Sequence, residues 1–240
     1  IAAGDLTSGS LKGLRAAIPK QLMGDAIAPG VRTAIDAALD RFRSEGAILT
    51  EVDVPSIALG VTTYYIIAPA EASSNLARFD GIRFGPRAEG GAGHVGLVEK
   101  TRGELFGHEV KARIMIGTYA LSAGYYDAFY ARAQQVRALM RREFDAVYRE
   151  HDVVLSPTSP TVAFRSGELD GDPLAMKLLD ACTIPANMGG MPGISIPCGF
   201  SEGLPVGLQL MAAVGEDEAL LRVAAAAERR CARSRSTATA

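Results

Sequence analysis

Arg113 and Asp180 stand out because each borders an apolar run, where a buried and unpaired charge would be costly. Arg113 precedes the run Ile114–Ile116, and Asp180 follows Leu178 and Leu179. A guanidinium can hold an α-carboxylate through two parallel hydrogen bonds, and a carboxylate can hold an α-ammonium. The two residue types therefore suit an amino acid ligand. Spacing alone favours a plainer interpretation, in which each residue is a solvated helix end or part of a structural ion pair.

The candidate nucleophiles are less favourable. Ser195 lies in the sequence GISIP, but the proline at position 197 excludes the GxSxG elbow of the α/β-hydrolases. Ser73 and Ser74 lie in an apolar, helical context. Cys198 has no neighbouring base in the sequence, which indicates a small buried residue rather than a reactive thiol. We therefore expect structural roles for all four residues.

Neither a dinucleotide site nor a metal site is predicted. The segment Gly91–Gly96 matches GxGxxG, but a charged stretch precedes it and we expect no helix to begin on it, so a flexible loop is favoured. The histidines His94, His108 and His151 lack the spacing of metal ligands, and ordinary surface roles are expected for them.

Composition describes a globular chain with a balanced charge. The 240 residues are 48% apolar, with a net charge of −2, which allows a sizeable core. The basic stretch Arg229–Arg235 is interpreted as a solvated helix end, so direct binding of nucleic acid is not expected. Three widely spaced cysteines fit a reducing cytoplasm. No apolar run approaches the about 18 residues of a membrane span, so no membrane partner is expected.

The pattern of apolar residues predicts an α/β fold, a mixed sheet flanked by helices. A strand over Leu14–Pro19, a helix ended by Gly46 and a strand over Ile48–Val54 form a parallel βαβ unit. Further helices are predicted over Thr62–Phe79 (largely buried), Glu109–Ala120, Gly124–Glu150, Leu174–Ala181 and Asp217–Arg233. Strands are predicted over Val153–Leu155, Ile194–Pro197 and Val206–Met211, with a long loop over Asp80–Gly107 and an irregular crossing between Ala181 and Ile194.

Four segments carry a resemblance to a known family: Thr63–Gly85, Val110–Arg137, Asp172–Phe200 and Gly203–Leu210. They resemble the amidase-signature family. The first two are similar, within that family, to the A subunits of glutamine-dependent Glu-tRNA(Gln)/Asp-tRNA(Asn) amidotransferases. The last segment, GLPVGLQL, is shared more widely among amidases.

The resemblance implies a function in translation. An A subunit hydrolyses glutamine through a serine nucleophile, with a second serine in a cis peptide and a lysine that relay protons. The ammonia passes to a B subunit, which uses ATP and Mg to activate the carboxylate on the charged tRNA, while a small C subunit wraps the A–B pair. The expected partners are therefore glutamine, the B and C subunits and, through the B subunit, charged tRNA. No cofactor is expected in this chain.

The resemblance also assigns residues. Arg113 matches the arginine that contacts the glutamine α-carboxylate, Asp180 matches the aspartate that contacts its α-ammonium, and Tyr64 is a further pocket residue. Nothing in the chain matches the two serines or the lysine, so no catalytic residue is assigned. We therefore expect residues 1–240 to be the C-terminal portion of a single amidase-signature domain, inactive alone. The open sheet edges of such a portion would favour association.

Two alternatives stay open. A free-standing amidase that acts on small amides would share GLPVGLQL but fits the segment Val110–Arg137 less well. A catalytically silent binding module, complete as it stands, is the third possibility. Copurification with B and C subunits would separate the first of these alternatives from the amidotransferase.

Overall fold

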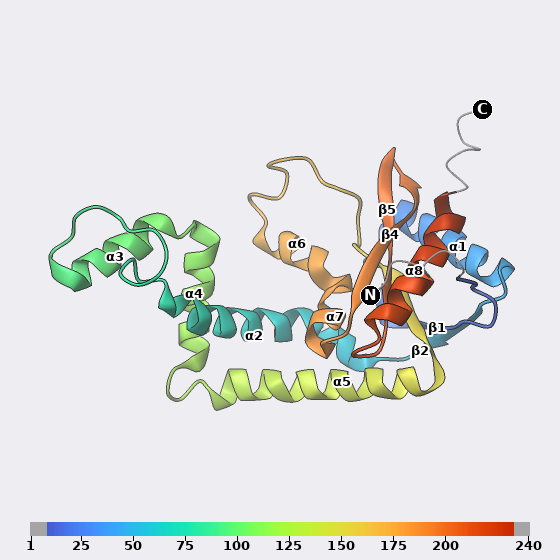
Figure 1. Cartoon of the computed structure of the whole chain (residues 1–240), viewed down its shortest axis with the longest axis horizontal. Helices are drawn as coiled ribbons and strands as arrows, with labels where there is room; N and C mark the ends of the chain where they lie inside the picture. Colours follow the sequence, from blue (N-terminus) through green and yellow to red (C-terminus); the bar gives the residue numbers. More distant parts are fainter. Residues whose placement is uncertain (1–8, 233–240) are drawn as a thin grey trace. The chain divides into compact units, whose positions relative to one another are not determined.

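A computed structural model describes residues 9–232, and the chain divides into two compact units. The first unit combines Ile1–Val61 with Arg137–Ala240, and the second is Thr62–Val136. Figure 1 shows the elements of both in chain order. The expectation of a single amidase-signature domain stays a prediction.

A five-stranded mixed sheet forms the centre of the first unit, as the sequence predicts. Its strands are β1 (Arg15–Pro19), β2 (Ile48–Val52), β3 (Val153–Pro157), β4 (Gly193–Ser201) and β5 (Leu204–Met211), in the order β2-β1-β3-β5-β4. Strand β1 runs parallel to β2 and β3, whereas β5 runs antiparallel to β3 and β4. The predicted parallel βαβ unit is confirmed.

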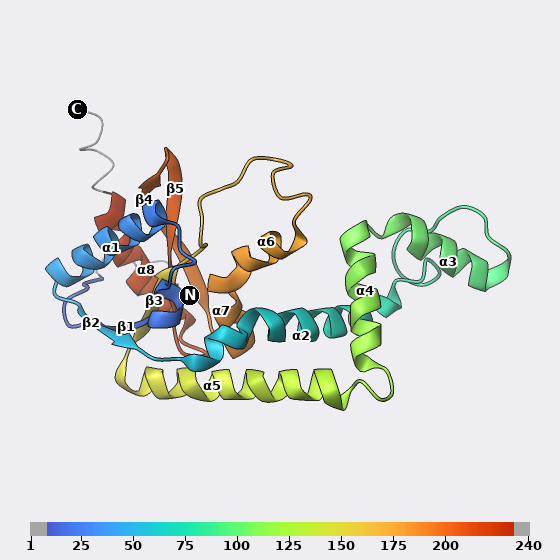
Figure 2. The ribbon, with the colours of Figure 1, turned by 180° about the vertical axis from the view of Figure 1, so that it is seen from behind.

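Helix α1 (Pro29–Ser44) connects β1 to β2 and covers one face of the sheet together with α8 (Asp217–Ala232). Both views of the ribbon show α1 and α8 together beside β4 and β5 (Figures 1 and 2). A proline at the first helical position and Gly46 with φ +87° beyond the last turn explain the helix bounds. The core beneath α1 includes Ile35, Leu155 and Leu208.

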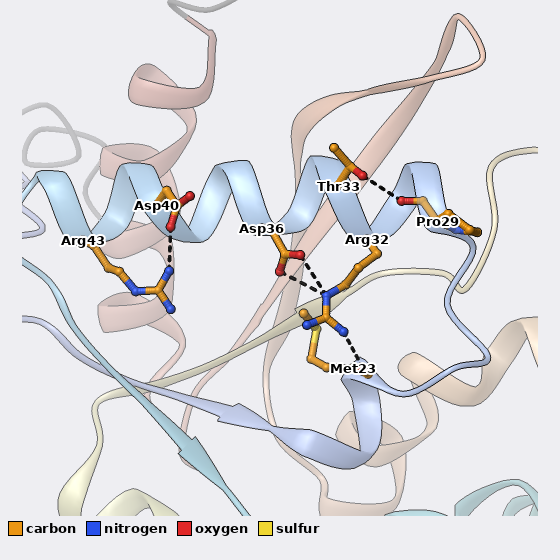
Figure 3. A network of polar contacts seen from close by, with 7 residues as sticks. All are labelled: Met23, Pro29, Arg32, Thr33, Asp36, Asp40 and Arg43. Carbon is orange, nitrogen blue, oxygen red and sulfur yellow. Dashed lines mark hydrogen bonds and ion pairs between the residues drawn. The ribbon is translucent and has the colours of Figure 1, made fainter.

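The outer face of α1 is polar and carries short-range pairs (Figure 3). Arg32 Nε lies 3.0 Å from Asp36 Oδ2, and Arg43 Nη1 lies 2.7 Å from Asp40 Oδ1. Arg32 also donates through Nη1 to the Met23 carbonyl at 2.6 Å, which fixes the segment before the helix. This alternation of a buried stripe and a charged stripe is what the sequence pattern predicts.

The second unit is helical. Its elements are most of α2 (Gly60–Asn75), α3 (Gly93–Leu105), α4 (His108–Leu121), and a π-helical turn, Asp127–Ala131, that leads into α5 (Arg132–Glu150). The helices predicted over Glu109–Ala120 and Gly124–Glu150 are confirmed, although the second begins with the π turn.

Two predictions in this unit are wrong. The segment Asp80–Gly107 is not one loop, because α3 begins at Gly93, inside the GxGxxG segment. The described element directly before α3 is the 3-10 turn Leu76–Arg78, not a strand. The helix has few buried residues and is held by contacts distant in sequence: Lys100 Nζ donates to Glu89 O at 2.5 Å, and Arg102 Nη1 donates to Leu76 O at 2.9 Å. Helix α2 ends before Phe79, and most of its residues are half-buried or exposed, so it is not largely buried.

The Gly- and Pro-rich crossing in the first unit is also more regular than predicted. After α6 (Pro173–Leu178) and a 3-10 turn, a short helix α7 (Ile184–Gly189) takes the place of the irregular crossing. Pro185 lies in the first turn of α7, where its missing N–H is not needed, and Gly190 with φ +66° ends the helix. Strand β4 extends beyond Pro197 because it lies at the sheet edge and accommodates a bulge there.

Candidate functional site

Arg113 and Tyr64 lie together in the second unit. Arg113, on α4, places Nε 2.8 Å from Glu109 Oε1 one turn earlier, and its guanidinium carbon lies 5.9 Å from the centre of the Tyr65 ring on α2. The pKa of Arg113 is raised, first by the hydrogen bond with Glu109 and further by the hydroxyl of Tyr64. The contact of Arg113 with α2 joins residues about fifty positions apart in sequence.

The guanidinium of Arg113 keeps donors for a ligand. The bond to Glu109 uses Nε and the Tyr64 hydroxyl is a further partner, but a guanidinium has five N–H donors, so donors remain for a carboxylate. The Arg113 side chain is about one-third exposed, at 32%, which leaves it accessible. This position is therefore chemically suited to an α-carboxylate.

Arg113 and Tyr64 lie together in the second unit, whereas Asp180 belongs to the first unit. It lies in the 3-10 turn Leu179–Cys182 that follows α6, and it is exposed. Its carbonyl accepts hydrogen bonds from Thr183, through the backbone N–H at 3.0 Å and through Oγ1 at 3.1 Å. These bonds fix the backbone that presents the carboxylate of Asp180.

The structure assigns plain roles to two of the candidate nucleophiles. Cys198 is 2% exposed, and burial raises the pKa of its thiol to about 12, which confirms the prediction of a small buried residue. The hydroxyl of Ser73 donates back to the Ala70 carbonyl at 2.8 Å, inside its own helix. Among the described residues, no group of histidine, cysteine and acidic side chains could hold a metal ion.

Ser195 has a partner that sequence reasoning missed. Its hydroxyl lies 2.7 Å from Thr158 Oγ1, which follows β3. Gly207 on β5 makes room for this pair, because a Cβ there would lie 2.6 Å from Ser195 Oγ and 2.7 Å from Thr158 Oγ1. The available signal was the segment SPTSP at the end of a buried strand, which places hydroxyl groups at an edge of the core.

The pair opens onto a cavity of about 460 Å³ in the first unit, between the sheet and α7. Asn187 and Gln209 also line it. None of its lining residues is an aspartate, glutamate, lysine or arginine. The cavity therefore combines neutral polar groups with apolar ones and has no ionic side chains.

A mixed sheet with α1 and α8 on one face agrees with what comparison with known proteins shows. The family model described as Amidase matches residues 4–221. The chain belongs to the amidase family.

Relatives at 50–54% identity share one description. The chain is 54% identical over 222 residues to the A subunit of the glutamyl-tRNA(Gln) amidotransferase of Chloroflexus aggregans, a match that covers 92% of this chain and 45% of the relative. It is 50% identical to the protein of that description from Brevibacillus brevis, with the same coverage. The chain thus spans somewhat less than half the length of these relatives, and the resemblance drawn from the sequence is confirmed.

Solved structures agree on the fold. The A subunit of the glutamyl-tRNA(Gln) amidotransferase of Thermotoga maritima is 40% identical, with a TM-score of 0.70 over 92% of this chain and 43% of that protein. A crystal structure described as an amidase superposes with a TM-score of 0.72 at 22% identity, which supports the fold alone. Of the described helices, none is long and apolar enough to cross a membrane.

Proposed function

We propose that the chain is part of a glutaminase subunit, which releases ammonia from glutamine for the transamidation of Glu-tRNA(Gln) or Asp-tRNA(Asn) in translation. The observation that carries this proposal is 54% identity over 92% of the chain to the A subunit of a glutamyl-tRNA(Gln) amidotransferase. In this function Arg113 binds the glutamine α-carboxylate, Asp180 binds the α-ammonium and Tyr64 contributes to the pocket. The donors that Arg113 keeps beyond Glu109 support its part.

In this function, the chemistry is divided between this chain and polypeptide sequence outside it. The nucleophilic serine, the second serine and the lysine belong to sequence outside it, so the chain contributes substrate binding and is inactive alone. The B and C subunits complete the complex, and ATP and Mg are used through the B subunit. The relatives' own description as a subunit supports such an assembly.

A glutaminase assay tests this division. Ammonia release from glutamine is measured with the chain alone, and then with a second polypeptide that carries the remaining length of the Chloroflexus aggregans relative. We expect no activity from the chain alone and activity after mixing. Activity from the chain alone would mean that it contains a nucleophile, which would overturn the proposed division.

The role of Arg113 gives the first prediction. In the mixed enzyme, Arg113→Ala should raise the KM for glutamine roughly 10- to 100-fold, because the hydrogen bonds of a charged pair contribute about 1.5–3 kcal/mol to binding. The matched control is Arg83→Ala, an exposed arginine of the same unit that pairs with Asp80.

A second substrate isolates the contact of Arg113 with the α-carboxylate. Hydrolysis of a small amide without an α-carboxylate should be equally fast in the enzyme and in the Arg113→Ala variant, since the lost contact has no counterpart on that substrate. An unchanged KM for glutamine in Arg113→Ala would show that this residue does not hold the α-carboxylate.

A further inference from the structure

Three side chains of the second unit surround the guanidinium of Arg113. Glu109, one turn earlier on α4, accepts a hydrogen bond from Nε at 2.8 Å. On α2, the hydroxyl of Tyr64 is a further partner of the guanidinium, and the centre of the Tyr65 ring lies 5.9 Å from its central carbon. The planar group is therefore contacted at one edge by its own helix and over one face by another helix. Neither Glu109 nor Tyr65 is assigned a part in the proposed binding of glutamine.

These surroundings distinguish Arg113 from the other arginines that pair with an acidic residue four positions away. The Arg113 side chain is 32% exposed. The other described arginines paired at this spacing are 44–50% exposed: Arg32, Arg141 and Arg222. Of these four described arginines, Arg113 is the one whose guanidinium lies over an aromatic ring of another helix. An ordinary surface ion pair needs neither the lower exposure nor a second helix, so these contacts indicate a guanidinium held in one orientation.

The close approach of α4 and α2 brings these groups together. Gly117 lies one turn beyond Arg113 on α4, and it faces α2 without a side chain. A Cβ on Gly117 would lie 1.9 Å from the carbonyl oxygen of Pro69, which is one turn beyond Tyr65 on α2. The Tyr65 ring also packs edge to face with that of Tyr64, with ring centres 5.1 Å apart. Backbone contact and ring packing thus keep the Tyr65 ring beside the guanidinium.

Holding an arginine in one orientation before a ligand arrives favours binding. A free arginine side chain occupies many rotamers and loses that freedom when it grips a carboxylate. A guanidinium that is already held loses less, and Arg113 still keeps donors for the ligand. We propose that Glu109 and Tyr65 are positioning residues, which orient the Arg113 guanidinium for the α-carboxylate of glutamine. The inference rests on the proposed function, from which the role of Arg113 is taken.

Hydrogen exchange of the Arg113 Nε–H measures this orientation on the chain alone. In ¹H–¹⁵N NMR spectra, the resonance is identified by its loss in Arg113→Lys. Glu109→Ala removes the acceptor and Tyr65→Leu removes the ring, so each should speed the exchange about 2- to 10-fold. Glu109→Gln keeps an acceptor and Tyr65→Phe keeps a ring, so both should exchange like the parent chain. Unchanged exchange in both Glu109→Ala and Tyr65→Leu, in variants whose spectra are those of a folded chain, would overturn the proposal.

Kinetics of the mixed enzyme show whether the orientation serves glutamine. Glu109→Ala and Tyr65→Leu should raise the KM for glutamine about 2- to 10-fold and leave kcat nearly unchanged, because the grip on the α-carboxylate is the same in the ground and transition states. A general loss of structure would lower kcat as well. The matched control is Glu104→Ala, which removes the acidic partner of Lys100 at the same spacing in α3. An unchanged or lower KM in both variants would show that these residues do not orient Arg113 for glutamine.

Glu109→Gln separates position from charge. The Glu109 carboxylate repels a ligand carboxylate, so removal of its charge alone should leave the KM for glutamine equal to the parent value or lower it. Equal increases of KM in Glu109→Gln and Glu109→Ala would show that the acceptor does not position the guanidinium.

The two measurements distinguish this inference from the proposed function. A mixed enzyme without glutaminase activity would mean that the proposed function is wrong, whereas the exchange rates on the chain alone would still decide whether Glu109 and Tyr65 hold the guanidinium. Unchanged exchange rates and KM values in an active mixed enzyme would mean that only the positioning role is wrong.

Discussion

At the scale of single residues, the ion pair of Arg113 with Glu109 is weak enough to be replaced. The two residues are one helical turn apart, and the carboxylate side chain of Glu109 is 67% exposed. Such a pair contributes about 0.3–0.5 kcal/mol to helix stability. A ligand carboxylate that engages the Nη groups therefore costs little local stability, even if it displaces Glu109. The pair holds the guanidinium in place before a ligand arrives.

The cysteines give a residue-scale prediction. Burial raises the pKa of both Cys182 and Cys198 to about 12, and burial also raises that of Cys231. At about pH 8 only roughly one thiol in ten thousand of Cys182 or Cys198 is ionised, and the thiolate is the reactive form. A disulfide reagent that releases a coloured thiol should therefore label the native chain very slowly and label all three cysteines after unfolding.

A surface thiol is the control for this labelling. Ser44→Cys places a cysteine at the exposed end of α1, and it should react within the time in which the native cysteines do not. Rapid labelling of Cys198 in the folded chain would contradict its buried role and would make it a candidate nucleophile again.

At the scale of elements, α4 and α2 meet at a glycine. A Cβ on Gly117 would lie 1.9 Å from the Pro69 carbonyl oxygen and 2.8 Å from the Ala70 nitrogen, so the backbones are in direct contact there. Pro69 lies inside α2. Only a glycine on α4 permits this approach, which explains why a residue unfavourable to helices lies in the middle of one.

This contact predicts opposite effects for two glycine substitutions. Gly117→Ala should destabilise the chain by about 1–3 kcal/mol, because the added methyl group forces two helix backbones apart. Gly103→Ala in α3 has nothing within 4 Å of the new Cβ and should stabilise its helix by about 0.5–1 kcal/mol. Unfolding in urea, followed by circular dichroism, measures both. Equal effects of the two substitutions would show that α4 does not pack on α2 as described.

The elements also show what the sequence can predict. The βαβ unit and α8 follow from apolar patterns that are visible within about fifteen residues of sequence. Helix α3 cannot be predicted from such a local pattern. The side chains of Lys100 and Arg102 hold it through hydrogen bonds to backbone carbonyls more than ten residues away. The same limit applies to the sites: Thr158 and Ser195 are 37 positions apart, and only pairing of β4 and β5 next to β3 brings them together.

At the scale of the whole molecule, a side-chain pair adds to the backbone pairing between β1 and β3. Asp152 precedes β3, and its carboxylate accepts hydrogen bonds from the Arg15 backbone N–H at 2.9 Å and from Arg15 Nη2 at 2.6 Å. Arg15 is the first residue of β1. The pair therefore connects the parallel βαβ unit to the later strands, which the chain reaches only after the second unit.

The charge of Asp152 makes the stability of the first unit sensitive to acid. The hydrogen bond with Arg15 is the main reason that the pKa of Asp152 is lowered from its ordinary value of 3.8. A lowered pKa stabilises the folded state fully above the unfolded value. That contribution is lost as the pH falls from about 4 through the lower folded value. The free energy of unfolding in urea should therefore decrease over this acidic range.

Asp152→Asn tests the origin of this acid dependence. The variant should be less stable than the parent chain near neutral pH, because it loses the ion pair, and the difference should shrink as the pH falls below about 4. Asp40→Asn is the control, since its pair with Arg43 lies within α1 and joins no strands. Urea unfolding of all three proteins across the acidic range supplies the measurement. A constant difference between Asp152→Asn and the parent chain at every pH would show that the Asp152 carboxylate does not connect the sheet in the way described.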